Sequence, residues 1–342
     1  MKESQPSTND WQRLYDAAVE FKKLKCWEWV LDSDIFGVQN PSNNEIGYCC
    51  ITGYLGQHFA LVVYLGTAGL EIYLKAKSGK VLESPLEIFA NQKCLMASFE
   101  DRETLSKEDR EVIKELGLRF RGQNQWPQFR SYQPGYPPWS LTRDEAEYLT
   151  LSLQQAKEVS LRFKEDPDIL ASSEESRYLV RVPEKVDDGY RWTDEWLEPD
   201  PLEEEPEAAI PPINEIRLQR IKKTIKRRGG SWEIDFFFTP TPVEDGEGRP
   251  YYPYAVLHVD SYQGIVLNAN MMKPVDYGTE IPNSLMSVIE NAQVIPNEIL
   301  VKKERTLELL NLIASRLGIR MKLMDRLEML EQAQFSMLQL FR

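Results

Sequence analysis

Apolar side chains recur every three or four residues near the start of the chain, at Trp11, Leu14, Tyr15, Ala18 and Phe21. One apolar stripe at this spacing predicts an amphipathic helix that packs on a core. Further along, the same spacing predicts helices at 66–77, 106–116 and 141–163, and continuous apolar runs predict strands at 46–52, 59–65 and 94–99. The first part of the chain therefore reads as a mixture of helices and strands.

Two stretches within this part predict loops. Residues 32–45 are rich in Asp, Asn and Gly, which favour turns over regular structure. Residues 125–139 combine prolines with aromatic rings, and proline forbids a regular helix because it lacks a backbone N–H. We expect the second stretch to be a loop that buries its own rings over a sheet.

The character of the chain changes after a hairpin predicted at 178–181 and 189–192. Acidic residues and prolines alternate from Asp194 to Pro212, which is typical of a semi-extended linker. A basic run with an apolar seam then predicts a helix over Arg217–Arg228. We expect an N-terminal α+β domain at 1–170, a connection of hairpin, acidic proline-rich linker and basic helix at 171–230, and a C-terminal domain at 231–342.

The C-terminal segment has a regular order of elements. Strands are predicted at 232–239, 254–260, 264–270, 298–301 and 319–323, and helices at 283–291, 306–317 and 326–341. The tight connection between the second and third strands predicts an antiparallel pair. Because strands that alternate with helices need right-handed crossovers, the last two strands should join the same mixed sheet in parallel.

This order resembles the ribonuclease H-like fold, and the residues resemble the retroviral and transposon integrase core. The resemblance rests on Trp232-Glu233-Ile234-Asp235 in the first strand, on Ala255–Ser261 leading into Gly264–Leu267, and on Pro296–Val301. It covers roughly the last third of the chain, and the order of the motifs carries it. It implies an α/β C-terminal domain with a five-stranded mixed sheet in the order βββαβαβα.

The whole chain also resembles an uncharacterised bacterial family that joins two domains of unknown function. Trp27 and the stretches 47–69 and 126–139 mark the N-terminal part of that resemblance. It implies an architecture and a bacterial source, without an activity.

In the integrase fold, two or three carboxylates hold paired divalent metal ions. The resemblance assigns the first acid to Asp235, but Lys302 and Lys303 stand where the second acid is expected. An ammonium group repels metal ions and competes for the aspartate. Without a metal, Asp235 would be solvated or would pair with Lys302. A magnesium or manganese site would have to combine Asp235 with Asp260, Glu304 or an acid of the last helix.

Composition limits the partners. The 342 residues carry a formal net charge of −13, which argues against a surface broadly adapted to nucleic acid or to anionic membranes. No apolar run has the length of a membrane span, and the polar N-terminus does not resemble a secretion signal. We expect a cytoplasmic protein with no membrane partner.

The few histidines and cysteines indicate no metal site. The chain has two histidines, His58 and His258, and both lie in apolar runs, so we expect packed, hydrogen-bonded core imidazoles. Its four cysteines form no CxxC pair and read as small buried thiols. Cys49 and Cys50 are adjacent and, on a strand, would face opposite sides.

Two groups of residues are candidates for binding. The proline-rich stretch carries Arg130, Tyr132 and Trp139, which could recognise a base or a peptide. The basic helix carries Lys222, Lys223, Arg227 and Arg228, which could contact nucleic acid, although a solvated face or a partner for the acidic linker explains them more simply.

Three functions remain open on the sequence. The leading hypothesis is a non-catalytic binding or adaptor protein with a degenerate ribonuclease H-like domain, no cofactor, and a protein or nucleic-acid partner. The alternatives are a metal-dependent nuclease or phosphotransfer enzyme centred on Asp235, and an RNA or single-strand binder that uses the basic helix.

Overall fold

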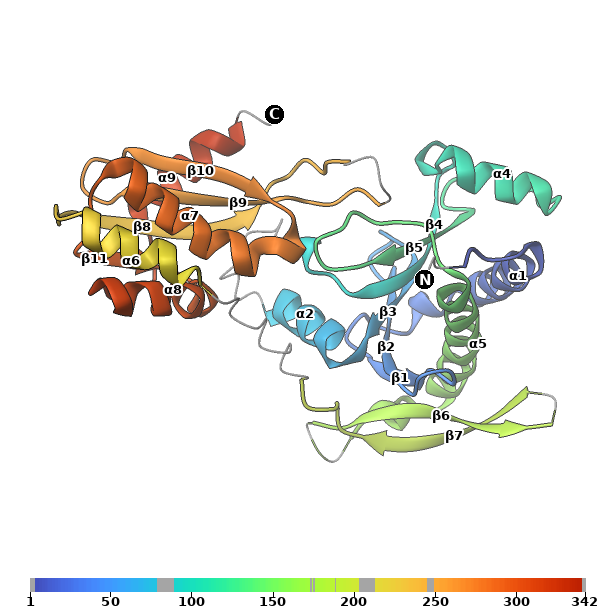
Figure 1. The fold of residues 1–342 in the computed structure, drawn as a ribbon. Coiled ribbons are helices and arrows are strands. Elements are labelled where there is room, and N and C mark those ends of the chain that lie inside the picture. Colours follow the sequence, from blue (N-terminus) through green and yellow to red (C-terminus); the bar gives the residue numbers. More distant parts are fainter. Residues whose placement is uncertain are drawn as a thin grey trace. The chain divides into compact units, whose positions relative to one another are not determined.

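The computed structural model describes residues 4–78, 89–172, 174, 176–187, 189–202, 213–244 and 249–339, which belong to two compact units (Figure 1). The first unit takes in Met1–Leu82, Asn91–Pro134 and Pro138–Glu203, and the second takes in Glu83–Ala90, Gly135–Pro137 and Glu204–Arg342. Each unit contains a mixed sheet with its own hydrophobic cores.

A seven-stranded sheet in the order β5-β4-β3-β2-β1-β6-β7 forms the centre of the first unit. Its strands are β1 (Phe36–Gln39), β2 (Ile46–Thr52), β3 (Ala60–Leu65), β4 (Cys94–Glu100), β5 (Trp126–Tyr132), β6 (Tyr178–Val186) and β7 (Gly189–Leu197). All neighbours are antiparallel except β1 and β6, where Gly37 pairs with Val180 and Val38 with Arg181 in parallel. The strands predicted at 46–52, 59–65 and 94–99 are confirmed to within one residue.

Helices cover both faces of this sheet. α1 (Thr8–Leu24) and α5 (Arg143–Glu165) lie on one face, and α2 (Gly66–Ser78) lies on the other (Figure 1). Strand alternation divides the core accordingly, because Cys49 packs with α1 and α5 whereas Cys50 packs with α2. The opposite orientation predicted for these two cysteines is confirmed, and all four cysteines are free and buried.

Three helices of this unit begin at capping boxes, in which a hydroxyl and an acidic side chain each satisfy a backbone N–H of the first turn. The boxes belong to α1, to α4 (Lys107–Glu115) and to α5, and they pair Ser7 with Asp10, Ser106 with Asp109, and Thr142 with Glu145. The helices predicted at 106–116 and 141–163 therefore begin within two residues of their predicted starts.

Both predicted loops were wrong, because each contains a strand. β1 is only four residues long and lies between β2 and β6, so its burial comes from distant strands that a local pattern does not reveal. β5 is an edge strand whose residues alternate between half-buried and buried positions. An edge strand tolerates Pro127, because only one side of it must supply hydrogen bonds to a neighbour.

The hairpin of β6 and β7 joins the first sheet through β6, beyond the boundary expected at residue 170. Its buried Arg181 donates to Oδ1 of Asp194 at 2.6 Å, to Oε1 of Glu158 at 2.8 Å and to Oε1 of Gln155 at 3.0 Å. A buried guanidinium needs such partners. The contacts fasten the hairpin to α5.

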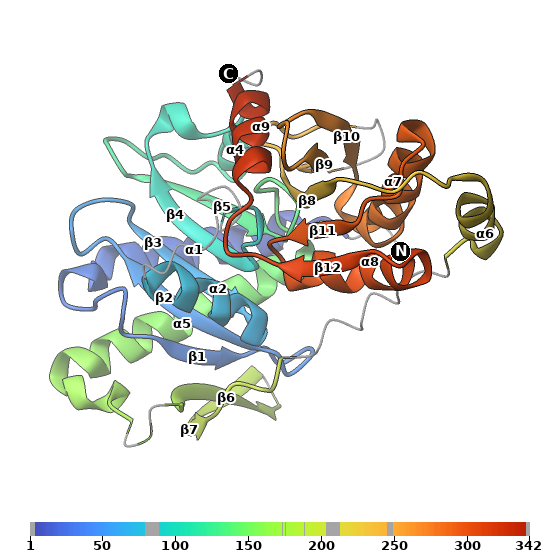
Figure 2. The same ribbon diagram turned by 90° about the vertical axis from the view of Figure 1, so that its left-hand side faces the viewer.

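A five-stranded sheet in the order β10-β9-β8-β11-β12 forms the centre of the second unit. Its strands are β8 (Ser231–Phe238), β9 (Tyr254–Asp260), β10 (Val266–Met272), β11 (Glu298–Val301) and β12 (Arg320–Leu323). β10, β9 and β8 are antiparallel, and β11 joins β8 and β12 in parallel. The predicted antiparallel pair and the two parallel additions are thus confirmed, and Figure 2 shows β11 and β12 side by side.

The helices of the second unit are α6 (Glu215–Thr224), α7 (Tyr277–Ala292), α8 (Glu304–Leu317) and α9 (Glu328–Gln339). The first three share one core with Trp232, Ile234 and Phe236 of β8. α9 packs on the other face through Leu330 against Phe237. Strand alternation therefore gives β8 two buried faces.

Short 3₁₀ turns lie at Cys26–Glu28, Arg102–Thr104, Pro167–Leu170 and Pro274–Asp276. Within the ranges given above, no helix combines the length and the apolar character needed to cross a membrane.

Candidate functional site

Asp235 lies on β8, the central strand of the second sheet, and is 7% exposed. Its Oδ1 accepts the backbone N–H of Phe236 at 2.8 Å, and the Oγ1 hydroxyl of Thr306 lies 3.4 Å from the same oxygen. Thr306 is fully buried in the first turn of α8. A helix N-terminus favours a nearby negative charge, so the fold itself stabilises this carboxylate.

The two lysines after β11 have different partners. The ammonium of Lys303 donates to the carbonyl oxygen of Phe236 at 2.6 Å, directly after Asp235 in the sequence. Lys302 instead pairs with Glu331 of α9, with 3.2 Å between Nζ and Oε1. We expected Asp235 to be solvated or to pair with Lys302. Instead Asp235 is buried, Lys302 pairs with Glu331, and it is Lys303 that brings positive charge to this part of β8.

A second buried carboxyl, Glu233, lies two residues before Asp235 and so on the same face of β8. Its Oε2 accepts the backbone N–H of Leu330 in the first turn of α9 at 2.7 Å. Burial raises the pKa of Glu233 above its usual range, although the hydrogen bonds from the start of α9 oppose the rise. Sequence reasoning missed this residue as a site candidate, although an acid inside a buried apolar strand could have indicated it.

The remaining acids of the metal alternative do not gather at Asp235. Cross-strand register pairs Asp235 with Leu257 and Trp232 with Asp260, so three residues separate the two positions along the sheet. That spacing is about 10 Å and reverses the face. Asp260 instead accepts the backbone N–H groups of Tyr262 and Gln263 in a turn.

Glu304, the other acid proposed, is the exposed first residue of α8. Among the residues that the structure describes, no group of three or more His, Cys, Asp or Glu side chains is arranged to hold a metal ion.

The expectation for the histidines was wrong in part. His58 is exposed in the turn between β2 and β3, with a positive φ of 49°. His258 is fully buried on β9, as expected, but neither ring nitrogen has a hydrogen-bond partner in the described part of the chain. Burial lowers the pKa of His258 to about 3, so its ring is neutral near pH 7.

Arg130, Tyr132 and Trp139 do not form one open surface. Arg130 makes a two-pronged ion pair with Asp109, at 2.8 and 2.5 Å, and the side chains of both partners are largely buried. Tyr132 is half-buried, with its hydroxyl 3.8 Å from the sulfur of Met96, whereas Trp139 is 42% exposed. The guanidinium of Arg130, on β5, is therefore bound to Asp109 of α4 and helps to hold that helix against the strand.

The basic helix is shorter than predicted. α6 ends at Thr224, and Arg228 forms a bridge to Ile295, so Arg227 and Arg228 are not helical. The guanidinium of Arg228 donates to the carbonyl oxygens of Leu317 and Gly318 at 2.9 and 2.7 Å, which caps the C-terminal end of α8.

Lys222, Lys223 and Arg227 are exposed, and none has a carboxylate partner within the described ranges. Of the four basic residues proposed for binding, these three therefore have side chains that are available to an external anion.

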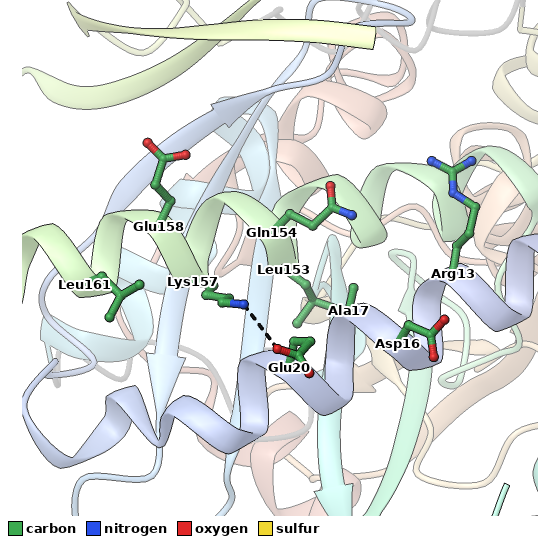
Figure 3. Close-up of a pocket in the computed structure, with 9 residues that line it drawn as sticks. All are labelled: Arg13, Asp16, Ala17, Glu20, Leu153, Gln154, Lys157, Glu158 and Leu161. Atoms are coloured by element: carbon green, nitrogen blue, oxygen red, sulfur yellow. Dashed lines mark hydrogen bonds and ion pairs between the residues drawn. The ribbon is translucent and has the colours of Figure 1, made fainter. Parts of the chain in front are cut away.

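A groove of about 570 Å³ lies between α1 and α5 (Figure 3). Ala17 and Leu153 give it an apolar floor, but its rim is charged. Lys157 reaches across to Glu20 at 3.3 Å, and Glu158 binds Arg181. These charges neutralise one another, so the groove indicates no particular ligand.

Comparison with known families yields two matches. The model of a domain of unknown function (DUF7309) matches residues 11–181, and that of a second domain of unknown function (DUF6930) matches residues 217–338. The two matches agree with the expected architecture of two domains of unknown function. No protein with a curated description matches the chain.

Proposed function

The chain belongs to the family of the domain of unknown function DUF7309, and from that premise we propose that it is a non-catalytic binding or adaptor protein of the bacterial cytoplasm. Its second unit would be a degenerate ribonuclease H-like domain that has kept the sheet and lost the metal centre. The family description carries no activity, so the proposal rests on the geometry around Asp235.

The order of the second sheet supports the likeness to ribonuclease H. Along the chain, the antiparallel strands β8, β9 and β10 come first. The parallel strands β11 and β12 follow, with α7 before β11, α8 between the two strands and α9 after β12. This is the βββαβαβα order that the sequence resemblance implies. Asp235 lies on β8, the first of these strands in chain order, where the resemblance places the first acid of the integrase core.

The observation that carries the proposal is the occupation of the site by the protein's own groups. Thr306 and the backbone of Phe236 contact the carboxylate of Asp235, and the ammonium of Lys303 is bound one residue away. Two metal ions need several converging oxygen ligands and no cation between them. The surroundings of Asp235 favour a retained structural aspartate over a metal ligand.

Calorimetric titration of the full chain with Mg²⁺ and Mn²⁺, together with a nuclease assay, tests this proposal. We expect wild type and Asp235→Asn to give the same heats and no cleavage. Asp325→Asn, which changes an exposed acid before α9, is the matched control. Saturable binding of two ions that Asp235→Asn abolishes and Asp325→Asn preserves would overturn the proposal in favour of a metal-dependent nuclease or phosphotransfer enzyme.

A second candidate function is the binding of RNA or single-stranded nucleic acid, which the exposed side chains of Lys222, Lys223 and Arg227 favour. A gel shift with a single-stranded RNA over a range of salt concentrations tests it. Changing all three residues to Gln should lower the slope of affinity against salt by about 2. The same change at Lys75, Lys107 and Lys185 of the first unit is the control, and no shift even at low salt excludes this function.

A further inference from the structure

A cleft of about 640 Å³ opens on the first unit, where the end of α1, the β2–β3 turn and the segment before β5 meet. Its walls include the rings of Trp27, Phe59 and Phe120, and the rings of Trp27 and Phe59 pack at 5.0 Å. The volume lies in the range that holds a small organic ligand, and aromatic walls are typical of such sites. All of its lining residues belong to the first unit.

A glycine shapes one side of the cleft. Gly53 has φ of +128°, and a Cβ atom there would lie 2.6 Å from Phe59 and 3.1 Å from Trp27. Only glycine allows both rings to approach the turn this closely, because any side chain would displace one of them. The turn and the rings therefore form one built surface.

The polar part of the cleft is cationic. Lys22, Lys23 and Lys25 at the end of α1 line it, together with the exposed Glu28. Lys23 already pairs with Glu20 at 2.7 Å, which lies outside the cleft. Lys22 and Lys25, by contrast, have no carboxylate partner in the described portion of the chain.

Lys22 is half-buried in this setting. Its ammonium donates to the carbonyl oxygen of Asn124 and lies 4.8 Å from the centroid of the Phe99 ring. A carbonyl and a ring face stabilise a cation less than a carboxylate does, and burial lowers the pKa of Lys22 to about 8. The cleft therefore offers a charge that the chain itself does not neutralise.

We infer that this cleft binds a small organic anion, whose apolar body lies against Trp27, Phe59 and Phe120 and whose acid group pairs with Lys22 and Lys25. Such a ligand supplies the counter-charge that the cleft lacks and covers the aromatic walls at the same time. The inference concerns the first unit alone and does not depend on whether Asp235 binds metal.

Calorimetry on the full chain tests the ligand class with matched probes. 2-Naphthoate and octanoate offer an aromatic and an acyl body, and 2-naphthamide and octanamide are their neutral counterparts. We expect at least one acid to bind about tenfold or more tightly than its amide, because a hydrogen bond to a charged group is stronger than a neutral one. The tighter of the two acids identifies the body that the walls prefer.

Proton uptake gives an independent readout of Lys22. At about pH 8, an anion that stabilises the ammonium draws protons onto Lys22, whereas at about pH 6 the ammonium is already formed. Titrations in two buffers of different ionisation heat measure this uptake. Lys22→Gln should abolish the uptake and reduce the preference for the acid to the part that Lys25 provides. Lys22→Arg should keep the preference without the uptake, and Lys23→Gln should keep both.

Equal affinity for acid and amide, no binding of any probe, or proton uptake that persists in Lys22→Gln would each overturn the inference. Because Lys22 also contacts Asn124, Lys25→Asn provides a second variant at an exposed position. Lys25 has φ of 52°, a conformation that asparagine tolerates. This change should weaken binding of the acid several-fold and leave that of the amide unchanged.

Discussion

The ammonium of Lys303 donates to the carbonyl oxygen of Phe236 across 2.6 Å and lies 4.7 Å from the centroid of the same residue's ring. One side chain thus holds the start of α8 against β8, beside Asp235. Lys302, its neighbour, makes only a partly exposed pair with Glu331 among the contacts described above. The two adjacent lysines therefore differ in what they contribute to the fold.

Lys303→Gln should lower the free energy of unfolding of the second unit by about 1–2 kcal/mol, because a charged hydrogen bond and a cation–ring contact are lost. Lys302→Gln should cost about 0.5 kcal/mol or less, as is usual for a pair in contact with water. Urea unfolding of both variants measures the difference. A larger loss for Lys302→Gln than for Lys303→Gln would contradict the arrangement.

The second unit should lose stability in acid through His258. Its pKa is about 3 in the folded protein against an ordinary value of 6.5, so the unfolded chain binds the proton more tightly between these values. Stability therefore falls as the pH drops from about 6.5 toward 3, by at most about 5 kcal/mol. His258→Leu should flatten this dependence and, by removing two nitrogens without partners, should not destabilise the unit at pH 7.

Thermal unfolding between pH 4 and 7 checks the effect of His258, with His58→Asn as the control at an exposed position of the other unit. The same dependence on pH in the wild type and in His258→Leu is the outcome that excludes this explanation.

Glu233 should destabilise the folded state at neutral pH. Burial raises its pKa, so the folded chain holds the proton more tightly than the unfolded chain, and stability falls as the pH rises above about 4.5. Glu233→Gln keeps an acceptor for the N–H of Leu330 and removes the charge. We expect a gain of up to about 1 kcal/mol at pH 7 and no gain near pH 4.

Glu298 on the neighbouring strand β11 provides a control of opposite sign for this experiment. Its pKa is lowered by the ammonium of Lys322, whose Nζ lies 2.8 Å from Oε2 of Glu298, so Glu298→Gln should lose stability at pH 7. Denaturant unfolding of both variants at pH 7 and near pH 4 measures the two changes in the free energy of unfolding. A gain from Glu298→Gln, or a loss from Glu233→Gln, is incompatible with these environments.

Arg130 should act on stability and not on ligand binding. Burial alone would raise the pKa of Asp109, but the guanidinium of Arg130 outweighs it and holds that pKa below its usual range. The stability from this pair is present at neutral pH and is lost as the pH falls through the lowered pKa. Asp109→Asn should cost about 2 kcal/mol in the first unit at pH 7 and progressively less below pH 4.

A double-mutant cycle with Arg130→Leu checks this pair, because coupled partners give losses that do not add. Additive losses would show that the contact contributes nothing.

The sequence predicted elements well where the pattern is long or the caps are strong. The helices α1, α4 and α5 carry both an apolar stripe and a capping box, and β8, β9 and β11 are dense apolar runs. It failed where structure depends on distant partners. Four residues of β1 are a strand only because β2 and β6 flank them, and Pro127 fits β5 only because that strand is an edge.

The sequence placed Asp235 on the first strand of the second unit, but it did not give the contacts of that residue. The position of Asp235 and the presence of lysine after β11 follow from the order of elements. The register of β11 on β8 and the packing of α8 and α9 decide the other contacts. They determine that Lys303, and not Lys302, reaches β8, and that Thr306 and Glu233 are buried near Asp235. The cleft near Lys22 combines three segments far apart in the chain, so no local pattern could reveal it.

The parallel pairing of β1 with β6 has a consequence for how the chain folds during synthesis. β2, β3 and β4 are neighbours along the chain and can pair as soon as they emerge, whereas Gly37 must wait for Val180. Until then the backbone N–H and C=O groups on one side of β1 are unpaired, and a strand of another nascent chain could pair with them. A fragment that stops at residue 170 keeps that edge for good, and it should aggregate where a fragment that continues through Leu197 does not.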